Sequence, residues 1–325
     1  MSWSLDRRRL LAAAAASCAP GLRAQPHFPE RAVRVIVPYG VGIGPDVVMR
    51  MVAENLSLRW RQPVLVDNKP GAAGIIAFGE VRRVAPDGHT LFLADTATMC
   101  VNPLIHDSLP YDPVRDLVPL TLLFQATFVI LVGGDSRWRS MSQLLDAARR
   151  ESGRISYGSL GNGHASQVAI ESLARAADVR LLHVPFKDAG ALFTTVAAGE
   201  VDFTAFGMNS VAGLLQRGRL RPLAVAARKR LADPADLPTL AEAGAPDVPM
   251  HPWAGLVAPA GVPEPVLAQL QQDLVAVINA PELRARVQPL GFELTPSTPQ
   301  QFRQRIDADL ALYAPLVREG RISRI

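Results

Sequence analysis

The chain has 325 residues, carries a formal net charge of +4 and is 49% hydrophobic, values typical of an ordinary globular protein. Its length exceeds what one hydrophobic core usually supports, so we expect two domains. The short run Arg228-Lys229-Arg230 is not the basic stripe of a nucleic-acid-binding protein, and we expect no nucleic-acid partner.

The first 24 residues predict a cleaved export signal and a periplasmic location. Three arginines at positions 7–9 precede a short apolar segment, and Leu22-Arg23-Ala24 offers a cleavage site before Gln25. Both a Sec signal and a twin-arginine signal fit this pattern. Cys18 also resembles a lipidation site, but cleavage after Ala24 fits better. No later stretch reaches the roughly 20 apolar residues of a membrane-spanning helix.

Short apolar runs then alternate with helical patterns. The first series predicts strands at 33–38, 64–67 and 91–94, a helix after Pro45 and a helix over 74–84. A second series predicts strands at 128–132, 155–157, 181–184, 201–206 and 222–226, with helices over 140–150, 166–177, 189–198 and 210–217. This alternation is typical of an α/β fold with largely parallel sheets.

The remainder of the chain is too short for a third domain. A Pro-rich stretch leads to a predicted strand at 253–258, and helices are expected from Pro263, from Pro281 and near Thr298. We expect these elements to return to the first sheet, which makes the first domain discontinuous. The expected division is a signal at 1–24, lobe 1 at 25–125 plus 227–325, and lobe 2 at 126–226.

The segment Val33–Asp46 carries the clearest functional signal. An apolar strand runs into Gly40, Gly42 and Gly44, and Pro45 then opens a helix. Glycines allow close approach to the main chain, and a helix N-terminus favours an anion. The sequence therefore predicts a carboxylate or phosphate site here, although a tight turn without a ligand would give the same pattern. Asp46 is expected to cap its helix and order the loop.

Other predicted strands also end in small or polar residues, at 94–98, 158–164 and 206–210. Ligands of open parallel sheets lie beyond the carboxyl ends of the strands, so these loops together predict a cleft between two lobes. The six histidines form no metal-binding pair, and Ser159 lacks the glycine of a nucleophile elbow. Cys100 is expected to be packing filler, with a thiol nucleophile as the alternative.

Several motifs resemble the Bug-type extracytoplasmic solute receptors of the tripartite tricarboxylate transporter systems. The resemblance covers nearly all of the expected mature chain. Its clearest motifs are Val35-Ile36-Val37-Pro38-Tyr39, Asn68-Lys69-Pro70-Gly71-Ala72-Ala73-Gly74, Ala85-Pro86-Asp87-Gly88-His89-Thr90-Leu91, Leu109-Pro110-Tyr111-Asp112-Pro113, Val184-Pro185-Phe186-Lys187 and Leu237-Pro238-Thr239-Leu240-Ala241-Glu242-Ala243-Gly244.

The resemblance implies a Venus-flytrap periplasmic receptor that binds a small organic carboxylate between two α/β lobes. No cofactor and no metal are expected, and the implied partners are the membrane components of a tripartite tricarboxylate transporter. The candidate ligand-binding residues are Tyr39, Gly40, Val41, Gly42, Gly44, Asp46, Thr96, Thr98, Ser159, Gly161, Asn162, His164, Phe206 and Gly207.

Departures from the family pattern bear on specificity. Phe206-Gly207 replaces a common Asp-Asn pair, which weakens the case for an amino-acid ligand, and His164 replaces a common Ser and adds a candidate cation. Lys187 is a further candidate cation, with a solvated lysine as the alternative. Two other functions stay open: a receptor that signals to a membrane sensor, and a periplasmic enzyme that uses the same cleft through His164 or Cys100.

Overall fold

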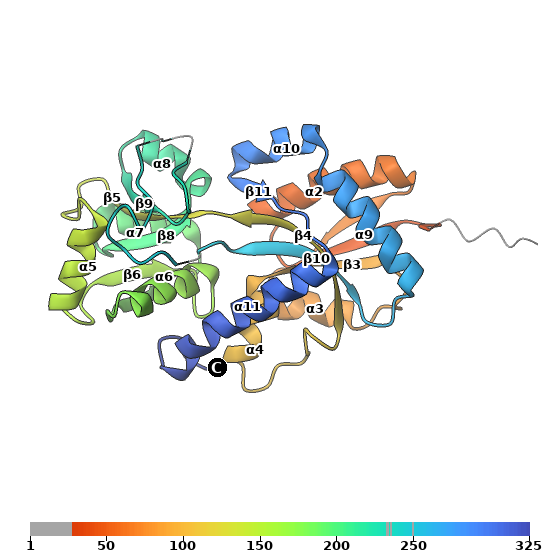
Figure 1. The fold of residues 1–325 in the computed structure, drawn as a ribbon, viewed down its shortest axis with the longest axis horizontal. Helices are drawn as coiled ribbons and strands as arrows, with labels where there is room; N and C mark the ends of the chain where they lie inside the picture. The colour runs from red at the N-terminus through yellow and green to blue at the C-terminus, as the bar shows by residue number, and fades with distance from the viewer. Residues whose placement is uncertain (1–27, 232–233, 235, 249) are drawn as a thin grey trace, which may run out of the picture.

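The computed structural model describes residues 28–231, 234, 236–248 and 250–325. The predicted export signal lies outside these residues. Two sheets, each covered by helices on both faces, form the two halves of the molecule (Figure 1). We call the half built on the six-stranded sheet lobe 1 and the half built on the five-stranded sheet lobe 2.

The sheet of lobe 1 has the strand order β11-β4-β10-β3-β1-β2. Its strands are β1 (Val33–Val37), β2 (Val64–Asn68), β3 (Thr90–Asp95), β4 (Leu117–Ala126), β10 (Trp253–Pro259) and β11 (Phe292–Leu294). Val33, Val35 and Val37 pack into one core and Ile36 into the other, because alternate side chains of a strand face opposite sides of a sheet.

Helices cover both faces of this sheet (Figure 1). One face carries α2 (Gly44–Trp60), α9 (Glu264–Ile278) and α10 (Pro281–Val287). The other carries α3 (Ile75–Val81), the π-helix η2 (Ala97–Val101), α4 (Asn102–Ile105) and α11 (Pro299–Arg318), with the 3₁₀ turn η1 (Ala72–Gly74) just before α3. The expected helix starts near Pro263, Pro281 and Thr298 are confirmed to within a residue.

The sheet of lobe 2 has the order β7-β6-β8-β5-β9. Its strands are β5 (Phe128–Gly133), β6 (Ser156–Ser159), β7 (Leu182–Pro185), β8 (Phe203–Gly207) and β9 (Leu220–Val225). Helices α5 (Met141–Arg150) and α6 (Ala165–Ala176) cover one face, and α7 (Ala189–Ala198), the 3₁₀ turn η3 (Met208–Val211) and α8 (Ala212–Gln216) cover the other.

The expectation of largely parallel sheets is wrong. In lobe 1, β10 is antiparallel to both β3 and β4, and β11 is antiparallel to β4. In lobe 2, β5 is antiparallel to β8 and β9. The reason is that β4 leads out of lobe 1 and β10 leads back in, so these neighbours run in opposite directions. Neither β4 nor β11 was expected as a strand.

Two crossings connect the lobes side by side (Figure 1). Thr127 alone separates β4 from β5, and the returning chain enters β10 after Pro252. The N–H of Ala126 donates to the carbonyl of Pro252 at 2.8 Å, so the two crossings are hydrogen-bonded to each other. The lobe boundaries expected at 125/126 and 226/227 stay a prediction.

The C-terminal segment forms a third link between the lobes. Helix α11 packs on β4 of lobe 1 and also contacts α6 of lobe 2. Beyond α11, Arg321 donates to the carbonyl of Val179 at 3.0 Å and pairs with Glu171 at 3.5 Å. The Tyr157 hydroxyl donates to the other carboxyl oxygen of Glu171 at 2.7 Å. The end of lobe 1 is therefore anchored in lobe 2.

Candidate functional site

The β1–α2 loop is organised by Asp46, whose side chain is fully buried. Its carboxylate accepts hydrogen bonds from the N–H of Gly42 at 2.8 Å, from Arg50 at 3.0 Å and from Asn68 at 2.7 Å. Burial opposes ionisation, but the hydrogen bonds from Arg50, Asn68 and Gly42 outweigh it and lower the pKa of Asp46. Asp46 thus orders the loop, as expected, although the helix N-cap is Ile43.

This arrangement corrects the expected use of the glycines. The N–H of Gly42 is already donated to Asp46, so it is not free to bind an anion in this conformation. Gly42 has a φ of 81°, which favours glycine. A Cβ on Gly44 would lie 2.7 Å from the ring of Phe292, so a larger residue there would force that ring to shift. Val41 is 74% exposed.

The end of β3 forms a second polar cluster. The Thr98 N–H donates to Asp95 Oδ1 at 2.8 Å, and the Tyr39 hydroxyl donates to Asp95 Oδ2. Burial raises the pKa of Asp95 against the opposing effect of these donors. The hydroxyl of Thr96 accepts a hydrogen bond from the N–H of Trp253 at 3.1 Å. Thr96 and Thr98 therefore fix the ends of β3 and β10 through their own hydroxyls.

The β6–α6 loop of lobe 2 is organised by uncharged groups. The Ser159 hydroxyl lies 2.6 Å from His183 Nε2 and accepts the N–H of Gly161 at 3.2 Å. Gln167 accepts the N–H of Gly163 at 2.7 Å and lies 3.2 Å from His183 Nδ1. These side chains lie beneath the loop and hold its amides in place.

His164 is the N-cap of α6, because its Nδ1 accepts the N–H of Ser166 at 3.2 Å. Its ring stacks on Phe206 at a centroid distance of 6.0 Å. Burial lowers the pKa of His164 to about 4, so the ring is neutral at neutral pH. The expectation that His164 adds a cation is therefore wrong. Phe206 is itself buried and also stacks on Phe128, at 5.8 Å.

A cavity of about 350 Å³ lies between the loops of the two lobes, and we call it the cleft cavity. Four expected residues line it: Tyr39 and Thr96 from lobe 1, and Asn162 and His164 from lobe 2. The sequence interpretation missed the remaining lining residues, which are Pro38, Gly71, Ala73, Gly74, Asp95, Ala97, Leu160, Gly163, Ala165, Pro252 and Trp253.

Some of these missed residues carry a signal in the sequence. Asp95 directly precedes the expected Thr96, and Gly71–Gly74 belongs to one of the family motifs. Ala72 and Ala73 have φ values of 47° and 48°, in the left-handed region that costs a non-glycine residue roughly 1–3 kcal/mol. Asn102 holds this strained turn by donating to the carbonyl of Ala73 at 2.9 Å. Trp253 is distant in sequence, and only the fold brings it here.

The other expected residues lie outside the lining of this cavity. They are Gly40, Val41, Gly42, Gly44, Asp46, Thr98, Ser159, Gly161, Phe206 and Gly207. Two of them, Asp46 and Ser159, hold loop amides through their side chains. Asn162 lines the cavity, yet its side chain donates to the carbonyl of Ser323 in the C-terminal segment at 2.8 Å.

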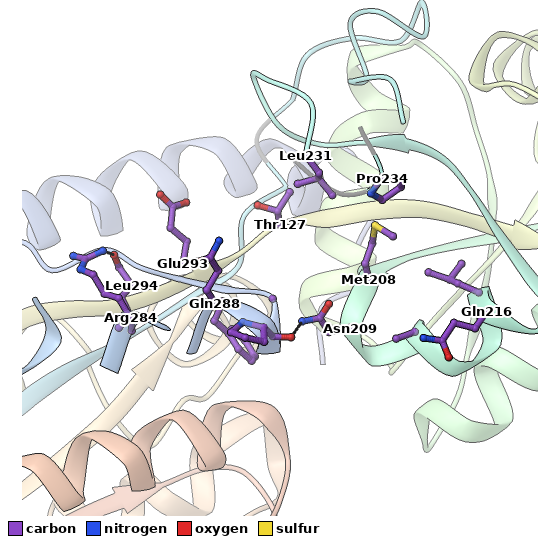
Figure 2. A pocket seen from close by; sticks show the side chains of 15 residues that line it. Thr127, Met208, Asn209, Gln216, Leu231, Pro234, Arg284, Gln288, Glu293 and Leu294 are labelled. Carbon is purple, nitrogen blue, oxygen red and sulfur yellow. Dashed lines mark hydrogen bonds between the residues drawn. The ribbon is translucent and has the colours of Figure 1, made fainter. Parts of the chain in front are cut away.

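A larger cavity of about 900 Å³ lies between η3 and α8 of lobe 2 and α10 and β11 of lobe 1. Figure 2 shows side chains from both lobes around it, including Asn209, which donates to the carbonyl of Pro289. Arg284 lines it, but its guanidinium is engaged by the carbonyl of Leu294 at 3.0 Å and by Asn279 at 2.8 Å. The fourteen expected site residues do not line this cavity.

The cleft cavity has no lysine or arginine among its described lining residues, and Asp95 is the one charged residue of that lining. Lys187 is exposed and lines neither cavity. Within the described ranges, His, Cys, Asp and Glu side chains do not gather in any group of three or more that could hold a metal ion. Across the same part of the chain, no helix has the length and apolarity needed to cross a membrane.

Cys100 is fully buried in η2, and its Sγ lies 3.7 Å from the carbonyl of Ile306. Burial raises the pKa of its thiol well above the usual value, whereas a nucleophilic cysteine needs a thiolate. Cys100 is also not among the residues that line the cleft cavity. Its position therefore fits packing filler.

Known proteins similar to this chain share its fold. "UPF0065 protein in tcbD-tcbE intergenic region" of Pseudomonas sp. (strain P51) is 32% identical over 98% of this chain and 96% of its own length. The structure "R. palustris Rpa4515 with adipate" matches with a TM-score of 0.81 and 26% identity over 92% of this chain and all of that chain. "Structure of periplasmic binding protein BugD" matches with a TM-score of 0.76 and 26% identity over 92% and 100%.

These matches confirm the expected two-lobed solute-receptor fold. The family described as "Tripartite tricarboxylate transporter family receptor" (TctC) matches residues 48–321, which is most of the chain. The resemblance to Bug-type receptors is confirmed as well. The chain belongs to the tripartite tricarboxylate transporter receptor family.

Proposed function

We propose that this protein is a periplasmic receptor that binds a small organic carboxylate in the cleft cavity. The observation that carries the proposal is the cavity itself, which is lined by loops at the strand ends of both lobes. A ligand that contacts both walls stabilises the closed arrangement of the lobes. The family match and the adipate-bound relative support a carboxylate as the ligand class.

The receptor delivers its ligand to the membrane components of a tripartite tricarboxylate transporter and does not transform it. The buried Cys100 supports binding without catalysis, since burial raises the pKa of its thiol and a nucleophilic cysteine needs a thiolate. A ligand recovered unchanged after incubation and denaturation is the expected result. Conversion of the bound compound would favour the enzyme alternative.

Export follows from the leader, with cleavage after Ala24. Mass spectrometry of the protein from a periplasmic fraction is expected to give a mature chain that begins at Gln25. A chain that retains its leader in that fraction, or one lipidated at Cys18, would contradict this part of the proposal.

A thermal-shift screen tests the binding function, because a ligand that binds only the native state raises its apparent stability. The compounds are mono-, di- and tricarboxylates, amino acids and neutral molecules of similar size. We expect hits among the carboxylates. Hits confined to neutral compounds would overturn the proposal.

Two alanine variants locate the site. Ala97 lines the cleft cavity and Ala212 lines the larger cavity. Ala97→Phe is expected to weaken binding at least tenfold, because the ring fills the space between the lobes, while Ala212→Phe leaves the affinity unchanged. The opposite pattern in a calorimetric titration would place the ligand in the larger cavity.

A further inference from the structure

Asp95 is the one charged residue in the described lining of the cleft cavity. A cavity that binds a carboxylate has no evident use for an acid at its wall, because like charges repel each other. The inference drawn below rests on the proposed receptor function and concerns the chemistry of the ligand.

The hydrogen bonds to Asp95 are unequal on its two carboxyl oxygens. Oδ1 accepts the N–H of Thr98 at 2.8 Å and lies 2.9 Å from the hydroxyl of the same residue. The Tyr39 hydroxyl is the one side-chain donor to Oδ2 among the residues that the structure describes. Because a carboxylate oxygen can accept two hydrogen bonds, Oδ2 retains one acceptor direction.

The opposite wall has the opposite polarity. It comes from lobe 2, where Ala165 opens the twelve-residue helix α6 and lines the cavity. A helix N-terminus carries a partial positive charge and favours an anion. The cavity therefore has an acceptor on its lobe 1 wall and a positive helix end on its lobe 2 wall.

We propose that Asp95 determines ligand choice, selecting an organic acid whose far end donates a hydrogen bond, an amine in preference to a hydroxyl, over a diacid. The ligand carboxylate faces the start of α6, and the donor group faces Asp95 Oδ2. A second carboxylate at that position meets the half-buried acid and lacks a donor to pair with. This also restores the case for an amino-acid ligand that the Phe206-Gly207 pair had weakened.

Calorimetric titration with compounds of matched length tests the inference. The pairs are γ-aminobutyrate with succinate, δ-aminovalerate with glutarate, and ε-aminocaproate with adipate. Caproate and ω-hydroxycaproate are added to the longest pair, so that an apolar end and a hydroxyl end are also compared. We expect the amino acid of the best-fitting pair to bind at least tenfold tighter than its diacid, with the hydroxy acid between them.

Three variants separate recognition from folding. Asp95→Asn is expected to lose at least tenfold in affinity for the amino acid and to bind the diacid more tightly. Tyr39→Phe removes the hydroxyl that donates to Asp95 Oδ2 but leaves the carboxylate in place, so it is expected to change the affinity for the amino acid less than Asp95→Asn does. Glu293→Gln removes an acid from the lining of the larger cavity and changes neither affinity.

Two results would overturn the inference, and they are distinguishable. In the first, the unaltered protein binds diacids more tightly than amino acids, and Asp95→Asn does not change this order. That result excludes the proposed role of Asp95 but agrees with the carboxylate receptor. Failure of every acid to bind, in this series and in the thermal-shift screen, removes the proposed function and this inference with it.

Discussion

The two loops that face each other across the cleft perform the same structural task with different chemistry. Each follows a strand and leads into a helix, and each contains glycines whose amides are held by side chains. In the β1–α2 loop the ionised Asp46 holds the amide of Gly42. In the β6–α6 loop the neutral Gln167 and Ser159 hold the amides of Gly163 and Gly161.

This difference shows that glycines alone do not define an anion site. The amide of a loop must be held in place by an acceptor, and an N–H that donates to that acceptor is not available to a ligand. The charged loop and the neutral loop should also respond differently to acid, because the carboxyl pKa of Asp46 in the first is lowered, whereas the second ends at the histidine cap of α6. Three predictions test the comparison.

The largest effect is expected from Asp46→Ala, which removes the acceptor of the Gly42 amide and one of the two acceptors of the Asn68 side chain. We expect a loss of about 3 kcal/mol in the free energy of unfolding, because breaking a buried charged network leaves its partners unsatisfied. Urea denaturation measures it. Arg50→Ala is the comparison variant and should cost less than Asp46→Ala, since Gly42 and Asn68 still donate to the carboxylate and Arg50 itself is partly exposed. Equal losses in the two variants would contradict the central role of Asp46.

The second prediction concerns acid sensitivity at His164, whose pKa falls from 6.5 to about 4 on burial. Between these values the unfolded chain binds a proton that the folded chain does not, so stability is complete above the unfolded pKa and declines as the pH falls. We expect this residue to account for a loss of about 2 kcal/mol between about pH 7 and about pH 5.

His164→Asn tests this contribution, because asparagine also caps a helix but does not titrate. Urea denaturation of both proteins at the two pH values isolates the contribution as a difference between their slopes. Identical pH dependence of the variant and the original protein would show that His164 is not responsible.

The smallest effect is expected at the glycines of the β1–α2 loop. Gly44→Ala should cost about 1–2 kcal/mol, because the added Cβ lies 2.7 Å from Phe292, and Phe292→Leu should recover part of the loss in a double-mutant cycle. Gly40→Ala is the matched control, since its nearest contact is 3.4 Å, and should change stability by less than about 0.5 kcal/mol. Full stability of Gly44→Ala together with lost ligand binding would restore the original ligand-based role of this glycine.

The elements of the fold were largely predictable because the hydrophobic pattern depends on nearby residues. The helix over 189–198 was predicted with the bounds that α7 has. The failures lie where strands pair with distant partners. The direction of β10 depends on β3 and β4, and the identity of β11 as a strand depends on its pairing with β4.

The candidate site was less predictable for the same reason. The ends of strands can be predicted from nearby residues, which is why Tyr39, Thr96, Asn162 and His164 were expected at the site. All four line the cleft cavity. The pKa of a side chain depends on what covers it, and burial, which lowers the pKa of His164, could not be read from the sequence.

By itself the sequence determined the family, the two α/β halves and the strand ends at which the loops occur, because motifs and periodicity are local properties. The tertiary structure decided which amides are occupied and which acid lines the cavity. Asp46 lies in the helix that follows β1 and Asp95 ends β3, yet one holds a loop and the other lines the cleft cavity. Only the packing around each carboxyl group, which joins residues distant in sequence, makes that distinction.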